Sequence, residues 1–256
     1  MMDFNEIRQY WDQRAGGDSS VQSTTQDIYL REIEFEAVLA QIQKCAPARV
    51  ADVGCGDGRT TVRLASRVAA ANFTGFDYAD SMVDNARKIH AHGDGARVRF
   101  DPLDICEGLT ESFDLIYTTR CLINLPSWEL QMQALYNIHA ALPVGGTYVM
   151  VENFVEGQNN FNQLRRQYGL NEIPVRAHNK FFERSRLVAF ADPLFSLAYE
   201  VNISSTYYLM SRVIYARICR DAGVEPDYFD DHHKLAAGLP FCGEFGPVRL
   251  VCFKKR

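Results

Sequence analysis

The sequence predicts an α/β fold built on a doubly wound, mostly parallel sheet of seven strands. Between residues 49 and 153, short β-rich apolar runs alternate with amphipathic helical stretches, which is the pattern of consecutive βαβ units. The 256-residue chain is 47% hydrophobic and 23% charged, as is usual for a globular protein with a full core. We therefore expect one domain over residues 1–256, with additional segments that form a lid.

Five of the expected strands lie in the alternating region and two lie beyond it. Before the fifth strand, apolar residues recur every three or four positions between Trp128 and Leu142, which predicts a helix with one buried face. Residues 195–204 alternate apolar and polar side chains, which predicts a sixth strand with one wetter face. The expected strands cover residues 49–53, 72–77, 97–100, 113–118, 146–153, 195–204 and 248–253.

Two segments after the fifth strand do not follow the βαβ pattern. Residues 155–180 are rich in Asn, Gln, Arg and Gly, show no clear period, and are too long for an ordinary connection between a helix and a strand. Residues 206–222 are expected to form a helix, and an irregular stretch follows it. We expect residues 155–180 and 206–245 to cover a binding site at the edge of the sheet.

Charge and cysteine content exclude several classes of protein. A net charge of -5 argues against long nucleic-acid tracks, so no DNA partner is expected. The seven cysteines form no Cys-x-x-Cys pair, which argues against a disulfide framework and against structural zinc. No apolar run is long enough for a bilayer, and the first residues are charged; we expect a cytoplasmic protein without a membrane partner. The composition leaves the oligomeric state open.

Histidines 232 and 233 follow Asp230 and Asp231, which raises the question of a metal site. Adjacent histidine side chains seldom point the same way, so no metal site is expected there.

The most informative stretch is Asp52–Gly58, where the first strand turns into the first helix. Its glycines can adopt positive φ and let a ligand approach the backbone. A dinucleotide fingerprint needs Gly-x-Gly-x-x-Gly, but Arg59 stands at the last glycine position. Asp52 would repel a pyrophosphate, whereas it can hold the ammonium of a methionine moiety, directly or through water. The turn therefore favours S-adenosylmethionine, and a purely structural turn is the alternative.

Two further acidic positions follow the second and third strands. Asp77 can accept two hydrogen bonds from a ribose diol. Asp104 can accept a hydrogen bond from an adenine amino group while Leu103 and Ile105 cover the ring. The alternatives are a helix-entry residue at Asp77 and an Asx-turn at Asp104. In this interpretation, three strand ends address three parts of one ligand.

Together with Phe113–Ile116 and Leu142–Gly146, these motifs resemble the successive motifs of class I S-adenosylmethionine-dependent methyltransferases. The resemblance covers residues 45–153, and Pro143-Val144 departs from the Lys-Pro of many members. It implies a Rossmann-like sheet with an antiparallel last strand, and helices in residues 1–45 over the cofactor. The implied contacts with S-adenosylmethionine are Asp52, Gly54, Cys55, Gly56, Asp77, Tyr78, Met82, Leu103, Asp104, Ile105 and Thr118.

The stretch Tyr10–Ala15 resembles the N-terminal helix that folds over the cofactor in many members of that family. Within it, Arg14 can pair with the methionine carboxylate, because a planar guanidinium suits that contact. A solvated arginine on a docking helix is the alternative.

The resemblance implies methyl transfer by in-line displacement, in which positioning and exclusion of water supply most of the rate. An oxygen acceptor usually needs a base, and the candidates are His178 and Glu152. We expect a small-molecule or glycan-like acceptor. Residues 118–121 read Thr-Thr-Arg-Cys rather than the Asn-Pro-Pro-Tyr type that grips a flipped base, which makes nucleic-acid substrates less favoured.

Two alternatives to a small-molecule enzyme stay open at this point. One is a protein or RNA methyltransferase, which needs a broad acceptor surface. The other is a non-catalytic scaffold that keeps the cofactor fold, because fold does not fix function. The basic cluster of the lid also has two interpretations, a solvated face or a site for an anionic acceptor. Its members are Arg165, Arg166, Arg176 and Lys180.

Overall fold

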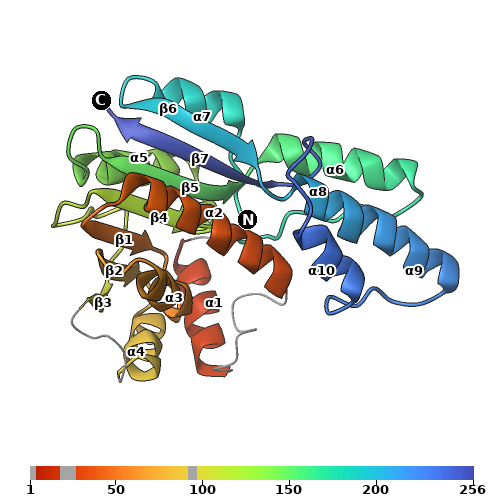
Figure 1. Ribbon diagram of the computed structural model, residues 1–256, viewed down its shortest axis with the longest axis horizontal. Helices are drawn as coiled ribbons and strands as arrows, with labels where there is room; N and C mark the ends of the chain where they lie inside the picture. Colours follow the sequence, from red (N-terminus) through yellow and green to blue (C-terminus); the bar gives the residue numbers. More distant parts are fainter. Residues whose placement is uncertain (1–3, 18–26, 92–96) are drawn as a thin grey trace.

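The structure is a computed structural model that describes residues 4–17, 27–91 and 97–256 (Figure 1). In the described chain, a seven-stranded sheet has the order β3-β2-β1-β4-β5-β7-β6. Neighbouring strands from β3 to β5 are parallel, and β7 is antiparallel to both β5 and β6. The strands are β1 Arg49–Val53, β2 Asn72–Asp77, β3 Val98–Pro102, β4 Leu115–Thr119, β5 Thr147–Asn153, β6 Phe195–Asn202 and β7 Val248–Lys255.

This topology confirms the predicted Rossmann-like sheet with an antiparallel last strand. The order runs outward from β1 in both directions, so the sheet has a switch point between β1 and β4. Ligands of open α/β sheets bind outside the carboxyl ends of the strands at such a point. The fold therefore places a binding site beside the turn that follows β1.

Helices cover both faces of the sheet (Figure 1). Successive side chains of a strand point to opposite faces. Val50 and Leu115 accordingly pack under α2 (Ile28–Cys45), whereas Ala51 and Ile116 pack under α5 (Trp128–Ala140) and α7 (Arg184–Ala191). The two faces have separate apolar cores, which hold the strand ends in fixed positions.

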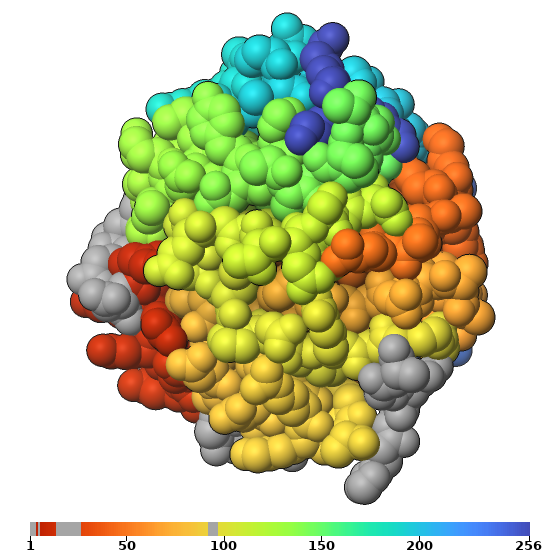
Figure 2. Space-filling view, turned by 90° about the vertical axis from the view of Figure 1, so that its left-hand side faces the viewer, coloured from red at the N-terminus to blue at the C-terminus, as the bar shows by residue number. Residues whose placement is uncertain are grey.

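Three shorter elements surround the ends of β1 to β3. The helix α3 (Arg59–Arg67) follows β1, and α4 (Asp80–Ile89) follows β2. The N-terminal helix α1 (Phe4–Gly17) packs against α4, and Figure 2 shows it in red at the surface beside the yellow of α4. Side chains of α1 thereby reach the carboxyl edge of the sheet.

A helical cap stands beyond β5 and consists of four helices and a π-helix. Its parts are α6 (Val155–Gln167), α8 (Ser205–Tyr208), the π-helix η2 (Leu209–Tyr215), α9 (Ala216–Ala222) and α10 (Asp231–Ala237). No described helix is both long enough and apolar enough to cross a membrane.

The cap differs from the sequence prediction in two places. Residues 155–167 form a regular helix, whereas the sequence predicts an irregular lid there. The buried face of α6 includes the polar side chains Gln158 and Asn162 beside Phe161. A helix with a polar buried face has no apolar period to detect. The expected irregular stretch after residue 222 also contains α10, which begins at an N-cap where Asp230 accepts a hydrogen bond from His232 N.

Candidate active site

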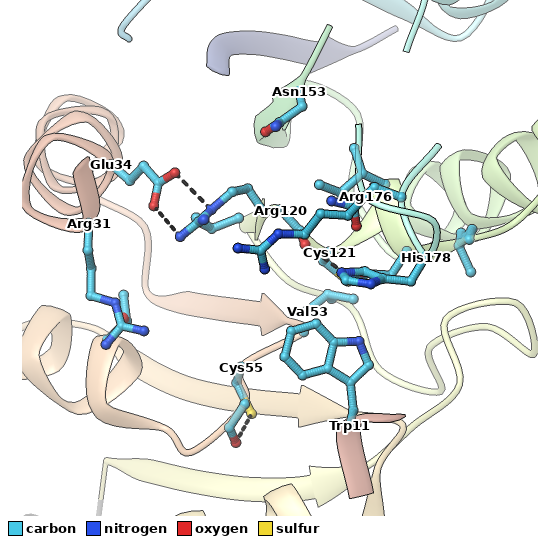
Figure 3. A pocket seen from close by; sticks show the side chains of 18 of the residues that line it. Trp11, Arg31, Glu34, Val53, Cys55, Arg120, Cys121, Asn153, Arg176 and His178 are labelled. Atoms are coloured by element: carbon cyan, nitrogen blue, oxygen red, sulfur yellow. Dashed lines mark hydrogen bonds and ion pairs between the residues drawn. The ribbon is translucent and has the colours of Figure 1, made fainter. Parts of the chain in front are cut away.

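One pocket of about 380 Å³ opens at the carboxyl edge of the sheet (Figure 3). Its first part, here called the strand-end half, is lined by residues 52–57, 77–78 and 103–105, with Met82 and the α1 residues Phe4 and Trp11. Its second part, the cap half, is lined by residues 119–121 and 123–125, Asn153, Gln158, residues 173–176, His178, Asn179, Tyr208 and Arg212. The two halves are continuous.

The turn after β1 requires glycine for its backbone conformation and for its packing. Gly54, Gly56 and Gly58 have φ values of 84°, 55° and 72°, which side chains disfavour. A Cβ on Gly54 would lie 2.5 Å from Sγ of Cys121. The N–H groups of Gly54 and Cys55 both donate to Phe76 O, at 2.7 and 2.9 Å, so the turn is pinned to β2.

The two strand-end carboxylates Asp77 and Asp52 have different surroundings. Asp77 accepts hydrogen bonds from the backbone N–H of Gly56 at 2.9 Å and of Ala79 at 3.0 Å. Burial raises its pKa. Asp52 is almost fully buried and accepts a 2.5 Å hydrogen bond from the Thr61 hydroxyl, and burial raises its pKa to about 6. A bound cation would relieve the cost of ionising Asp52.

The other predicted residues of the strand-end half also line the pocket. Asp104 forms an Asx-turn, because its Oδ1 accepts from Cys106 N at 2.8 Å. The Tyr78 ring stacks on Phe4 at 5.6 Å, and its buried hydroxyl has no hydrogen-bond partner among the described residues. Met82 packs against Trp11 of α1. These contacts place α1 over the strand-end half. The predicted residues that line the pocket are Asp52, Gly54, Cys55, Gly56, Asp77, Tyr78, Met82, Leu103, Asp104 and Ile105.

Thr118 does not belong to this set. Thr118 is fully buried and bonds to the Tyr148 hydroxyl at 2.9 Å, so its side chain lies inside the sheet layer and Thr119 lines the pocket instead. Residues next to each other in a strand point to opposite faces, which explains the one-residue difference. Arg14 lies in α1, but its side chain is outside the described residues.

Arg31 of α2 lines the pocket and was not predicted from the sequence. It lies in the first turns of α2, where the helix dipole disfavours a cation. A basic residue at that unfavourable position is the signal that sequence reasoning could have used. Figure 3 shows its guanidinium on the same side of the pocket as Cys55.

A buried ion pair forms one wall of the cap half. Arg120, which follows β4, places Nε 2.9 Å from Oε1 of Glu34, and its Nη2 donates to Oε2 at 3.0 Å (Figure 3). Arg120 has a φ of 50°, a left-handed conformation that a side chain adopts at a cost of about 1–3 kcal/mol. The backbone conformation of Arg120 and its ion pair with the buried Glu34 carboxylate together fix the direction of this guanidinium.

Residues 173–180 pass over the cap half and are fastened at both ends. At one end, Ile173 exchanges hydrogen bonds with the Asn162 amide, at 3.0 and 3.1 Å, and its carbonyl also accepts from Gln158. At the other end, Lys180 N donates to Ile123 O at 2.7 Å, and the Lys180 carbonyl accepts from Gln131. The polar residues of α6 therefore hold a cover over the pocket.

The first candidate base, His178, lies on this cover and lines the pocket. Its side chain is 9% exposed, and its ring stacks on Tyr10 of α1 with the centroids 4.7 Å apart. The Trp11 ring meets it edge-on at 6.1 Å. His178 thus stands where α1, the cover and the cap half meet (Figure 3).

The second candidate base, Glu152, is fully buried and is not among the residues that line the described pocket. Its carboxylate accepts hydrogen bonds from the backbone N–H groups of Cys121, Leu122 and Ile123, at 3.0, 2.9 and 3.3 Å. Burial raises its pKa to about 7. The geometry makes Glu152 a support for the turn after β4, because its oxygens already have three donors.

Comparison with known proteins gives a family. The sequence model described as Methyltransferase domain matches residues 50–146. A trans-aconitate 2-methyltransferase of Variovorax paradoxus (strain S110) is 33% identical over 43% of this chain and 40% of the relative. A malonyl-[acyl-carrier protein] O-methyltransferase of Paenibacillus sp. (strain JDR-2) is 22% identical over 64% and 62%. In both cases, the match spans less than two thirds of the relative's own length.

A solved structure shares the fold along nearly the whole chain. It is the magnesium protoporphyrin IX methyltransferase of Synechocystis PCC 6803 with bound S-adenosylhomocysteine, with a TM-score of 0.62, 17% identity, and 99% and 100% of the two chains covered. The fold, the glycine turn and the family match define a class I methyltransferase domain. Residues 50–146 of this chain are therefore assigned to the class I S-adenosylmethionine-dependent methyltransferases, and the chain as a whole shares the fold of the solved methyltransferase.

Proposed function

We propose that this protein transfers the methyl group of S-adenosylmethionine to a small-molecule or glycan-like acceptor. The observation that carries the proposal is the continuity of the pocket. Its strand-end half has the glycine turn and the acidic strand ends of the family, and its cap half provides a separate polar chamber beside it. A donor and an acceptor can therefore lie side by side with the reacting atoms in one cavity.

The residues of the strand-end half fit this cofactor. The proposed contacts are Asp77 with the ribose diol, Asp104 with the adenine amino group, and Asp52 with the ammonium, directly or through water. Arg31 is proposed for the methionine carboxylate, as is Arg14 of α1. The buried Tyr78 hydroxyl without a partner among the described residues supports a polar ligand in this half.

When bound, S-adenosylmethionine supplies an electrophilic methyl group on a sulfonium. The chain orients the two reactants and excludes water, for which α1 and the cover at residues 173–180 are suited. His178 is proposed to accept the proton of a hydroxyl or amine acceptor. Glu152 is proposed to position the 121–123 turn between the two halves rather than to move a proton.

The covered cap half supports a small acceptor over a protein or RNA. A macromolecular substrate needs an open surface at the site, whereas residues 173–180 are fastened across it at both ends. The name of the Variovorax relative contains a small organic acid, and that of the Paenibacillus relative contains a malonyl group, which agrees with acceptors of modest size.

Calorimetry tests the cofactor assignment. We expect heat of binding with S-adenosylmethionine and with S-adenosylhomocysteine, and none with NAD, because Asp52 and the spacing of the glycines suit a methionine head group. Binding of NAD without binding of S-adenosylmethionine would refute the proposal. Incubation with S-adenosylmethionine and a library of acceptors, with S-adenosylhomocysteine release as the readout, then separates an enzyme from a non-catalytic scaffold.

A further inference from the structure

The charges of the cap half do not cancel. Glu34 pairs with Arg120, and Asp27 pairs with Arg212 through a direct contact of Oδ2 and Nη2. The Arg176 side chain also lines the pocket, and no hydrogen bond or ion pair joins it to any described residue. Figure 3 shows its guanidinium turned into the pocket. Arg176 is an exposed residue that lines the chamber, and it has no counter-ion among the described residues.

The rest of the basic cluster predicted in this region points elsewhere. Arg165 donates to the carbonyl of Asn171 at 2.6 Å, and Arg166 pairs with Glu172 on the surface. Neither arginine lines the described pocket, and neither does Lys180. The two interpretations of the cluster thus separate by residue: Arg165 and Arg166 have partners in the cap, and Arg176 alone of the four faces the site.

Arg120 adds a second set of donors beside Arg176. A guanidinium has five N–H groups on three nitrogens. Glu34 engages the edge formed by Nε and Nη2, which leaves Nη1 for a ligand. Because Arg120 is fixed by its ion pair and by its backbone conformation, it can orient a planar anion that Arg176 attracts.

The chamber also contains amide oxygens that lack donors. Oδ1 of Asn153 is buried and has no hydrogen-bond partner among the described residues, and the whole side chain is 8% exposed. Oδ1 of Asn124 is also buried without a hydrogen-bond partner among the described residues, whereas its Nδ2 donates to Arg120 O at 2.9 Å. Buried acceptors without donors are costly, so a ligand with an O–H or N–H group is expected to meet them.

We propose that the methyl acceptor is a small hydroxy or amino carboxylic acid. Its carboxylate pairs with Arg176 and with the free edge of Arg120, and a further O–H or N–H proton, distinct from the one that His178 accepts, is donated to Asn153. A carboxylate matches the charge of Arg176, which has no ionic partner among the described residues, whereas a phosphate would bring a charge of about -1.5 to -2. This inference rests on the proposed function, since it names the acceptor class of the same site.

Matched pairs of ligands test the inference on the full chain saturated with S-adenosylhomocysteine. The panel contains hydroxy and amino carboxylic acids of two to ten carbons and the corresponding neutral amides, and binding is measured by calorimetry. We expect at least one acid to bind at least about tenfold more tightly than its amide. R176Q should remove most of that preference.

The control is R166Q, which removes a surface arginine of the same cap that pairs with Glu172 and lies outside the pocket. It should keep the preference, and both variants should bind S-adenosylhomocysteine as the wild type does. Three outcomes overturn the inference: equal binding of acids and amides, an unchanged preference in R176Q, or no binding by any acid. Methylation of a neutral acceptor would overturn the inference alone, whereas failure to bind S-adenosylmethionine would overturn the proposed function itself.

Discussion

The two halves of the pocket are assembled in different ways. In the strand-end half, the defining contact joins Gly56 to Asp77, 21 residues apart, across two neighbouring parallel strands. In the cap half, Glu34 meets Arg120 across 86 residues, and Asp27 meets Arg212 across 185. The first half follows from the rule that ligands bind at strand ends, and the second depends on long-range pairing of charges. Specificity is thus expected to reside in the half that local sequence motifs describe least.

The sharpest test of this division is H178A, because His178 belongs to the cap half and the proposed cofactor contacts do not. With a hydroxyl acceptor, turnover should fall by about 10²-fold or more, as expected for loss of a general base. The affinity for S-adenosylmethionine should stay nearly unchanged. Steady-state kinetics and calorimetry measure the two quantities, and undiminished turnover in H178A would remove His178 from the proton transfer.

Glu152 tests whether the frame between the halves is structural. Its pKa is raised from 4.5 to about 7 by burial, so the folded protein holds this proton more tightly than the unfolded chain does. The resulting stabilisation is fully present below pH 4.5 and is lost as the pH rises to about 7. Glutamine cannot ionise, so E152Q should not lose stability between pH 4.5 and 7 through this position.

Between pH 4.5 and 7, the unfolding free energy of the wild type should fall by at most about 3 kcal/mol more than that of E152Q. Urea denaturation of the wild type and of E152Q at several pH values measures it. Parallel pH profiles for the two proteins would show that the buried carboxylate titrates normally. A conservative variant such as E152D, which keeps the charge, should keep a pH-dependent loss.

The strand-end half is tested by D77A. This variant should weaken the binding of S-adenosylmethionine by about 1–3 kcal/mol, the usual cost of removing a charged hydrogen-bond partner. Because Asp77 also accepts from Gly56 and Ala79, far-UV circular dichroism and thermal denaturation must show an intact fold. An unchanged dissociation constant would reduce Asp77 to a helix-entry residue. D101A is a suitable control, since Asp101 is a half-exposed β3 residue outside the described pocket.

The accuracy of the sequence prediction differs between the strand-end half and the cap in the same way. The β1 and β2 boundaries agree residue for residue with the prediction, because short β-rich runs end at clear markers, Gly54 after β1 and Asp77 at the end of β2. The helix α6 escaped prediction because its buried residues Gln158 and Asn162 are satisfied by the backbone of Ile173, which only the folded chain brings near. Periodicity detects apolar burial and does not detect polar burial.

The candidate site shows the same limit. The ten cofactor-contact predictions that line the pocket are carried by strand ends, or by the helix that follows one. Glu152 is predicted as a base from its place near the end of the fifth strand, whereas the three N–H groups that donate to it come from residues about 30 positions away. Arg31 and Glu34 lie one turn apart on α2, where their surroundings depend on β4 and on the cap. Partners at that separation cannot be assigned from a single sequence.

The smallest expected effect concerns α1, which joins the two halves by covering both Tyr78 and His178. Phe4 stacks on Tyr78 at 5.6 Å with 23° between the ring planes, and Tyr10 stacks on His178. An aromatic pair contributes about 0.5–1.5 kcal/mol beyond the area it buries. F4L keeps an apolar side chain and removes the ring, so cofactor affinity should fall by about two- to tenfold.

The exposed α1 residue Arg8, which pairs with Asp80 on the surface, provides the control variant R8Q. Equal dissociation constants for F4L, R8Q and the wild type would mean that α1 does not cover the bound cofactor, and the link between the halves would then rest on the 121–123 turn.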